Sequence, residues 1–204
     1  RFVAGRILKY YRRSADVIHP PVDAGAFGIL PSSERGDYFL MVGRLIAYKR
    51  HDIAIRAFNE LKLPLKIIGR GPEYDRLKKL AGPTIEFLGR VSDAELPRYY
   101  SACRAFIFPQ EEDFGIVAFE AFASGRPLIA FRGGDIPEHL EDGKMGIFFD
   151  RQTVDDIVTA VRTFRDADYD PDFIRQKALA FDRSIFKKKM RSYLDRVCSE
   201  RGII

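Results

Sequence analysis

Residues 37–69 have the sequence DYFLMVGRLIAYKRHDIAIRAFNELKLPLKIIG, which predicts a strand, a helix and a second strand. Apolar and β-branched residues dominate 37–43 and 63–69, as expected of strands that are buried on both faces. Between these runs, apolar side chains recur at the spacing of one helix face, at Ala54, Ala57, Phe58 and Leu61. A unit of this kind joins two parallel strands of one sheet.

The same alternation continues along the chain. Further strand patterns are TIEFLG (84–89), RAFIFP (104–109), RPLIAF (126–131) and MGIFFD (145–150). Ser92 and Glu95 form a capping box before one helix, and Pro97 is expected to distort its first turns. Thr153 is a predicted N-cap of another helix. We therefore predict an α/β fold, a doubly wound, mostly parallel six-stranded Rossmann-like sheet.

The two ends of the chain depart from this pattern. Residues 1–13 are predicted to form a basic helix, and 15–23, ADVIHPPVD, a short extended strand. A helix and a strand without a partner sheet suggest the end of a preceding domain. We therefore divide the chain into a crossover or linker segment, 1–30, and a main domain, 31–204, which ends in helices.

Composition is that of one ordinary globular domain, with 204 residues, 46% hydrophobic and 31% charged. The net charge of +5 fits either a nucleic-acid binder or a small phosphate-bearing ligand. Only two cysteines, Cys103 and Cys198, argue against a disulfide scaffold and for a reducing cytosol. No apolar run approaches the roughly 20 residues of a membrane span, and the first residues do not resemble a signal peptide.

The last helix has a basic face, formed by Lys187, Lys188 and Arg191. This face could contact acidic lipid headgroups, although a solvated surface is the favoured interpretation. We therefore expect a cytoplasmic protein, with peripheral contact at the inner face of the membrane as the open alternative.

Candidates for a metal site do not have the expected spacing. In the acidic stretch that begins at Asp166, Pro171 stands where an EF-hand loop needs glycine, and Lys177 where it needs glutamate. The histidines are scattered without zinc spacing, at His19, His51 and His139. We predict that no metal is bound.

Cations gather where the first strand leads into its helix. Gly43 and Arg44 end the strand, and Lys49 and Arg50 follow at the start of the helix. Cations are unfavourable at a helix N-terminus, which is already positive, so three of them together call for an anion. Arg44 could bind it through a bidentate fork and Lys49 as a point charge. Two ordinary surface cations are the less favoured alternative.

A second candidate lies in 110–127, QEEDFGIVAFEAFASGRP. The helix that begins at Ile116 is apolar all round and so predicted to be buried, yet it contains Glu120. A buried carboxylate needs strong donors, which ribose hydroxyls could supply, or an internal pair with Arg or Lys. Glu112 precedes the helix, where the free N–H groups of Gly115, Ile116 and Val117 would form an anion site.

Two glycine-bearing loops complete the candidate site. Gly89, Arg90 and Val91 end the third strand, and 132–135, RGGD, end the fifth. Each loop could admit a ligand close to its backbone or could be only a tight turn.

Taken together, these motifs resemble the C-terminal, donor-binding half of the retaining family 4 glycosyltransferases, which have the GT-B architecture of two facing Rossmann-like domains. The resemblance covers nearly the whole chain. It rests on VIHPPVD, VGRLIAYKR, LKIIGRGPEYDRLKKL, IEFLGRVSD, EEDFGIVAFEAFASGRP and GGDIPEHLEDGKMGIFF. Glu112 and Glu120 match the E-x7-E motif of that family.

The resemblance implies roles for the candidate residues. Catalytic roles would fall to Glu112, which would contact the transferred sugar, and to Arg44 and Lys49, which would hold the diphosphate. Glu120 would bind the ribose. The remaining donor-binding positions would be Gly43, Arg90 and Val91, the last two beside the base, and the backbone of Asp113, Phe114, Gly115, Ile116 and Val117. The family needs no metal or other cofactor.

The resemblance also implies a substrate class. Asp113, Arg70 and Arg50 depart from the residues most frequent in the family, and this combination resembles its mannosyltransferase-like members. We therefore expect residues 31–204 to bind a nucleotide-sugar donor, GDP-mannose in preference, for transfer of a hexose to a glycan or lipid-linked acceptor. The N-terminal acceptor domain would be missing, and nucleic acid would not be a partner. A non-catalytic nucleotide- or nucleotide-sugar-binding domain is the alternative.

Overall fold

The computed structural model describes residues 1–202 and contains a six-stranded sheet; residues 203 and 204, the end of the predicted main domain, lie outside the described residues. The strands are β1 (Phe39–Val42), β2 (Leu65–Ile68), β3 (Ile85–Gly89), β4 (Phe106–Phe108), β5 (Leu128–Phe131) and β6 (Gly146–Phe149). Their order is β3-β2-β1-β4-β5-β6, and each pair of neighbours is parallel. The predicted doubly wound sheet is therefore confirmed, and it is parallel throughout.

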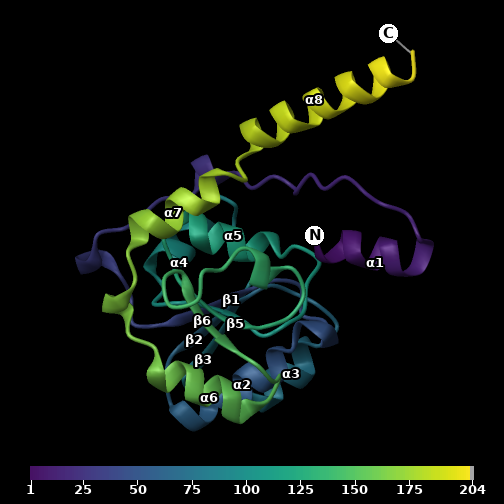
Figure 1. Ribbon diagram of the computed structural model, residues 1–204. Helices are drawn as coiled ribbons and strands as arrows, with labels where there is room; N and C mark the ends of the chain where they lie inside the picture. Colours follow the sequence, from purple (N-terminus) through teal and green to yellow (C-terminus); the bar gives the residue numbers. More distant parts are fainter. Residues whose placement is uncertain (203–204) are drawn as a thin grey trace.

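Helices cover both faces of the sheet (Figure 1). One layer contains α2 (His51–Leu61), α3 (Tyr74–Leu80) and α6 (Val154–Thr163), and the other contains α4 (Leu96–Ala102), α5 (Ile116–Ala123) and α7 (Pro171–Leu179). Alternate side chains of each strand point into opposite layers. In β1, Phe39 packs into the first layer and Leu40 into the second. Each face therefore has its own apolar core.

Local capping follows the predictions. The backbone N–H of Glu95 donates to Ser92 Oγ at 3.3 Å, and the N–H of Ser92 donates to Glu95 Oε2 at 3.2 Å. Helix α4 begins after this turn, with Pro97 in its first turn, where its missing N–H has no helical partner to lose. The hydroxyl of Thr153 caps α6 by accepting from the N–H of Asp156.

Two sequence-based expectations are wrong. The strand–helix alternation fails between β5 and β6, where only the short 3-10 turn η4 (Ile136–Glu138) intervenes. The strand expected within 15–23 is also absent, because this segment makes only an isolated bridge between Val22 and Asp182. Pro20 and Pro21 lack backbone N–H groups, which prevents a continuous ladder there.

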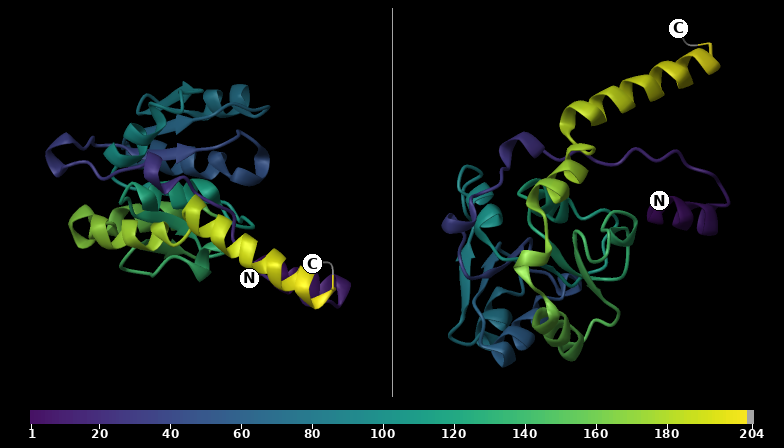
Figure 2. Two further views of the ribbon diagram at one scale, coloured as in Figure 1. Left: turned by 90° about the horizontal axis from the view of Figure 1, so that it is seen from above. Right: turned by 60° about the vertical axis from the view of Figure 1, so that its left-hand side comes forward.

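Helices α1 (Phe2–Tyr11) and α8 (Arg183–Glu200) lie outside the two layers, and neither contains a buried residue (Figure 2). An ion pair between Arg196 and Asp16, 3.2 Å long, joins α8 to the extended segment that follows α1. In residues 1–202, no helix combines the length and apolar character needed to cross a membrane.

Candidate functional site

The strand order reverses between β1 and β4, and this reversal places two of the candidate segments beside each other. The chain leaves β1 and β4 towards helices on opposite faces of the sheet, so a crevice forms outside the carboxyl ends of these two strands. The loop after β1 contains Arg44 and Lys49, and the loop after β4 contains Glu112. The sheet therefore brings the predicted cations and the acidic loop to one edge.

A hollow of about 260 Å³ lies at the carboxyl ends of β1, β2 and β3. Four predicted donor-site residues line it, namely Gly43, Arg44, Arg90 and Val91. Arg70, which the sequence analysis did not assign to the site, adds a third guanidinium group to the lining. Three guanidinium groups against one carboxylate, that of Asp93, therefore give the hollow a net positive charge.

Lys49 and Glu112 do not line this hollow but form an ion pair beside it. Both side chains are largely buried, and the hydroxyl of Tyr48 also donates to Glu112 Oε1, at 3.3 Å. Burial lowers the pKa of Lys49. Lys49 is therefore held by a carboxylate, and its predicted convergence with Arg44 on a single anion stays a prediction.

The N-terminus of α5 has free donors. Gly115 adopts φ 79°, and a Cβ at this position would meet the ring of Phe108 at 2.7 Å, so the turn requires glycine. Among the described residues, no hydrogen bond satisfies the backbone N–H groups of Gly115, Ile116 or Val117. Such a helix end attracts an anion.

The glycine loop after β5 supports this acidic loop. Gly134 adopts φ 70°, and a Cβ there would clash with the backbone of Glu112. The N–H of Asp135 donates to the carbonyl oxygen of Glu112 at 2.9 Å. Gly134 therefore permits the close approach of the Glu112 backbone instead of a ligand, and this contact positions Glu112.

Helix α5 is less buried than the sequence predicts. Ile116 is 45% exposed, so α5 is not covered on every side. Phe114 is buried and stacks on Phe119, with ring centroids 4.2 Å apart, so only its backbone can face a ligand. Asp113 is exposed and pairs with Arg6 of α1 at 3.1 Å.

Glu120 has a buried partner that the sequence analysis missed. The hydroxyl of Tyr100, a fully buried residue of α4, donates to Glu120 Oε2 at 2.7 Å. Among the described residues, Glu120 therefore does not form the Arg or Lys pair that was one expectation for it, and its contact with a ribose stays a prediction. Burial raises the pKa of Glu120, and the charge of Asp93, which lines the hollow, adds to the rise.

We expect the variant Glu120→Gln to have a higher free energy of unfolding than the parent chain at about pH 7, because it removes a disfavoured charge and keeps an acceptor for Tyr100. The native parent holds this proton more tightly than the unfolded chain does. Its stability therefore falls as the pH rises from the ordinary value of 4.5 through the raised pKa, and the difference between variant and parent vanishes below that range. Urea unfolding of the parent and the variant at about pH 7 and about pH 4 measures the free energy of unfolding of each protein at both pH values. A less stable variant at both values would contradict the expectation.

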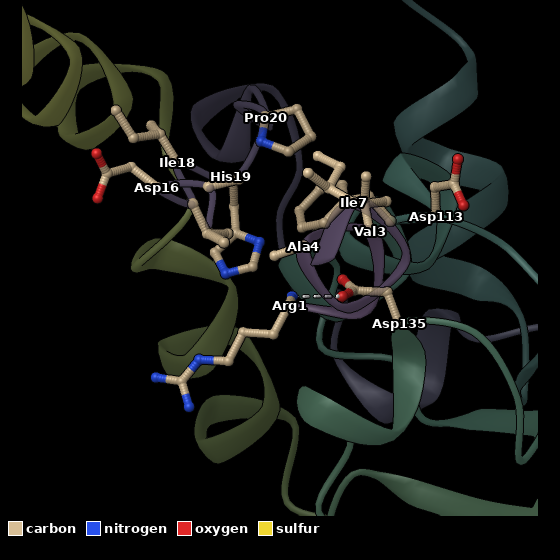
Figure 3. A pocket seen from close by; sticks show the side chains of 13 residues that line it. Arg1, Val3, Ala4, Ile7, Asp16, Ile18, His19, Pro20, Asp113 and Asp135 are labelled. Atoms are coloured by element: carbon tan, nitrogen blue, oxygen red, sulfur yellow. Dashed lines mark hydrogen bonds and ion pairs between the residues drawn. The ribbon is translucent and has the colours of Figure 1, made fainter. Parts of the chain in front are cut away.

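A second pocket, of about 200 Å³, lies between α1, the extended segment after it and the loops that follow β4 and β5 (Figure 3). His19, Asp113 and Asp135 are among its lining residues. The amino nitrogen of Arg1 donates to Asp135 Oδ1 at 3.2 Å. This pocket adjoins the acidic loop but is distinct from the hollow at β1–β3.

Comparison with known proteins supports a single family. Residues 23–178 match the model of the family described as glycosyl transferases group 1. A curated relative from Mycolicibacterium smegmatis, named GDP-mannose-dependent alpha-(1-6)-phosphatidylinositol monomannoside mannosyltransferase, is 32% identical; the match covers 79% of this chain and 50% of the relative. The chain spans half or less of the length of the curated relatives it matches.

Solved structures share the fold. Sucrose-phosphate synthase from Thermosynechococcus elongatus superposes with a TM-score of 0.83 at 20% identity, over 96% of this chain and 56% of the other. HepE from Anabaena, solved in complex with UDP-glucose, superposes with a TM-score of 0.74 at 20% identity, over 89% of this chain and 57% of the other. At this identity the similarity establishes the architecture of the domain.

Proposed function

We propose that this chain, which belongs to the group 1 family of glycosyl transferases, is the donor-binding part of a hexosyltransferase that uses a nucleotide-diphosphate sugar. The observation that carries the proposal is the arrangement at the carboxyl ends of β1 and β4. There, Arg44 lies in a cationic hollow, Lys49 pairs with Glu112, and the N-terminus of α5 has unused donors.

These groups suit the charge that develops during glycosyl transfer. The bond between the anomeric carbon and the diphosphate breaks, a bond from the acceptor oxygen to that carbon forms, and the acceptor proton passes to an oxygen of the departing diphosphate. Negative charge accumulates on the departing diphosphate, where preorganised cations and N–H groups stabilise it more than they stabilise the bound donor. We propose that Arg44, Lys49 and the α5 N-terminus supply this stabilisation without a metal ion.

Recognition of the donor is assigned to the remaining residues. Tyr100 occupies Oε2 of Glu120, which leaves Oε1 to accept from ribose hydroxyls. Arg90 and Val91, which line the hollow, would flank the base. Glu112 would contact the transferred sugar. Lys49 would leave its ion pair with Glu112 and bind the diphosphate. The name of the mycobacterial relative supports GDP-mannose as the donor.

We further propose that an acceptor domain completes the enzyme. Helices α1 and α8 expose apolar side chains, including Leu8 at 59% and Leu194 at 51%, which such a domain could cover. The acceptor would be a glycan or a lipid-linked glycan, reached in the cytoplasm or at the inner face of the membrane. Transfer by this chain alone should then be negligible.

Calorimetry with GDP, UDP and ADP tests the donor assignment on this chain. We expect GDP to bind at least about 10-fold more tightly than UDP or ADP, a difference of about 1.4 kcal/mol that contacts from Arg90 and Val91 to the base could supply. Equal affinities would refute the guanine preference. Absence of heat with all three nucleotides would refute the proposed donor site.

A further inference from the structure

Beside α1, His19 meets Asp135 and His139, which lie more than 100 residues further along the chain. The ligand atoms of His19, Asp135 and His139 all lie within 4.8 Å of one another. The sequence spacing of the histidines suggested that they were scattered, but the fold brings His19 and His139 together. We propose that these three side chains form a binding site for one divalent transition-metal ion of the zinc type. The inference does not depend on the proposed transfer reaction.

Each ligand comes from a defined element. Asp135 and His139 flank η4, and His139 Nε2 lies 2.7 Å from Asp135 Oδ2. His19 belongs to the extended segment after α1, and its ring meets that of His139 edge to face, with centroids 5.0 Å apart. The site therefore joins this segment to the loop between β5 and β6.

The donor set selects the class of metal. Two imidazole nitrogens and one carboxylate oxygen suit zinc and neighbouring transition metals, whereas Mg²⁺ and Ca²⁺ prefer oxygen ligands throughout. Three protein ligands leave a fourth position for water. Ligand atoms of a tetrahedral zinc site lie about 3.3 Å apart. The contact between His139 Nε2 and Asp135 Oδ2 therefore has to widen by roughly half an ångström to admit the ion.

The surroundings favour a bound cation. The side chain of Asp135 is 2% exposed and that of His139 is 8% exposed, and the rings of Phe114, Phe119 and Phe181 surround His139 with centroids 5.1 to 5.9 Å away. Such an apolar shell strengthens the attraction between a carboxylate and a metal ion.

The site also has an entrance for the ion. His19 and Asp135 line the pocket of about 200 Å³ beside α1, so the site can be reached from solvent (Figure 3). The Asp135 N–H also holds Glu112, so a bound ion would brace the acidic loop and the extended segment together.

The test uses the chain without a histidine tag, freed of metal by a chelator and titrated with Zn²⁺ and Co²⁺ in a calorimeter. We expect one ion per chain and visible absorption bands of a low-coordinate site with Co²⁺. The variant His19→Gln should weaken binding by more than the roughly 10–100-fold typical of losing an outer-shell partner. Asp16→Asn, which removes an exposed carboxylate from the same segment and pocket, is the matched control and should bind as the parent does.

His19 is the primary position because loss of the buried Asp135 could unfold the chain, and circular dichroism checks that each variant is folded. Zn²⁺ should raise the unfolding temperature of the parent and of Asp16→Asn but leave that of His19→Gln nearly unchanged. Failure of the parent to bind either ion would overturn the proposal. So would binding that His19→Gln leaves intact, since the ion would then lie elsewhere.

Discussion

Replacing Lys49 with alanine should slow hexose transfer about 10²–10³-fold in a two-domain protein that joins this chain to an acceptor-binding domain. This is the loss typical when one preorganised group that stabilises a developing anion is removed. Lys49 is largely buried, so its charge acts in a medium of low polarity, where it stabilises a departing diphosphate more strongly than an exposed cation could. Steady-state kinetics with the nucleotide sugar would measure the loss, which should fall mainly on kcat.

Lys79→Ala is the control, because Lys79 is an exposed residue of α3 and its loss should leave the rate unchanged. Lys49 also neutralises Glu112, so its removal leaves a carboxylate without its cation. Adding Glu112→Gln separates the two effects. If Lys49→Ala acted only by freeing that charge, the double variant would be no slower than Glu112→Gln alone. Full activity of Lys49→Ala would instead show that Lys49 does not stabilise the departing diphosphate.

The sheet could be predicted from the sequence because each strand carries its own signal. The six strands are short and mostly apolar, with charged residues only at Lys66 of β2 and Glu86 of β3, and glycine or proline marks the ends of several, as at Gly43, Gly69 and Pro109. A parallel strand buried on both faces has to be apolar throughout, so such runs identify it without knowledge of its partners. The alternation failed after β5, where Pro137 and the turn at Gly143 limit the chain to a 3-10 turn.

The details of the site could not be predicted in the same way, because they depend on contacts between distant side chains. Tyr100 and Glu120 lie on separate helices, and their hydrogen bond exists only because α4 and α5 pack on the same face of the sheet. The pairing of Lys49 with Glu112 likewise requires β1 and β4 to be neighbours. Sequence spacing predicts which residues reach the correct edge of the sheet, but not which partners they find there.

The second large expected effect follows from replacing Arg44, and it concerns the affinity for the nucleotide instead of the rate of transfer. It lines the hollow at the end of β1 and is exposed, and among the described residues its side chain makes no hydrogen bond or ion pair. It is therefore available to a ligand without first losing a partner. A hydrogen bond to a charged group contributes about 1.5–3 kcal/mol, so Arg44→Ala should weaken GDP binding by about 10–150-fold. Arg56→Ala, at an exposed position of α2, is the control.

Comparison of GDP with GMP in the same calorimeter isolates the pyrophosphate. The parent chain should bind GDP far more tightly than GMP, because only GDP presents a second phosphate to Arg44 and Lys49. Arg44→Ala should remove most of that difference while changing GMP affinity much less. If the parent chain bound GDP and GMP equally well, or if Arg44→Ala left the preference for GDP intact, these residues would not form a pyrophosphate site.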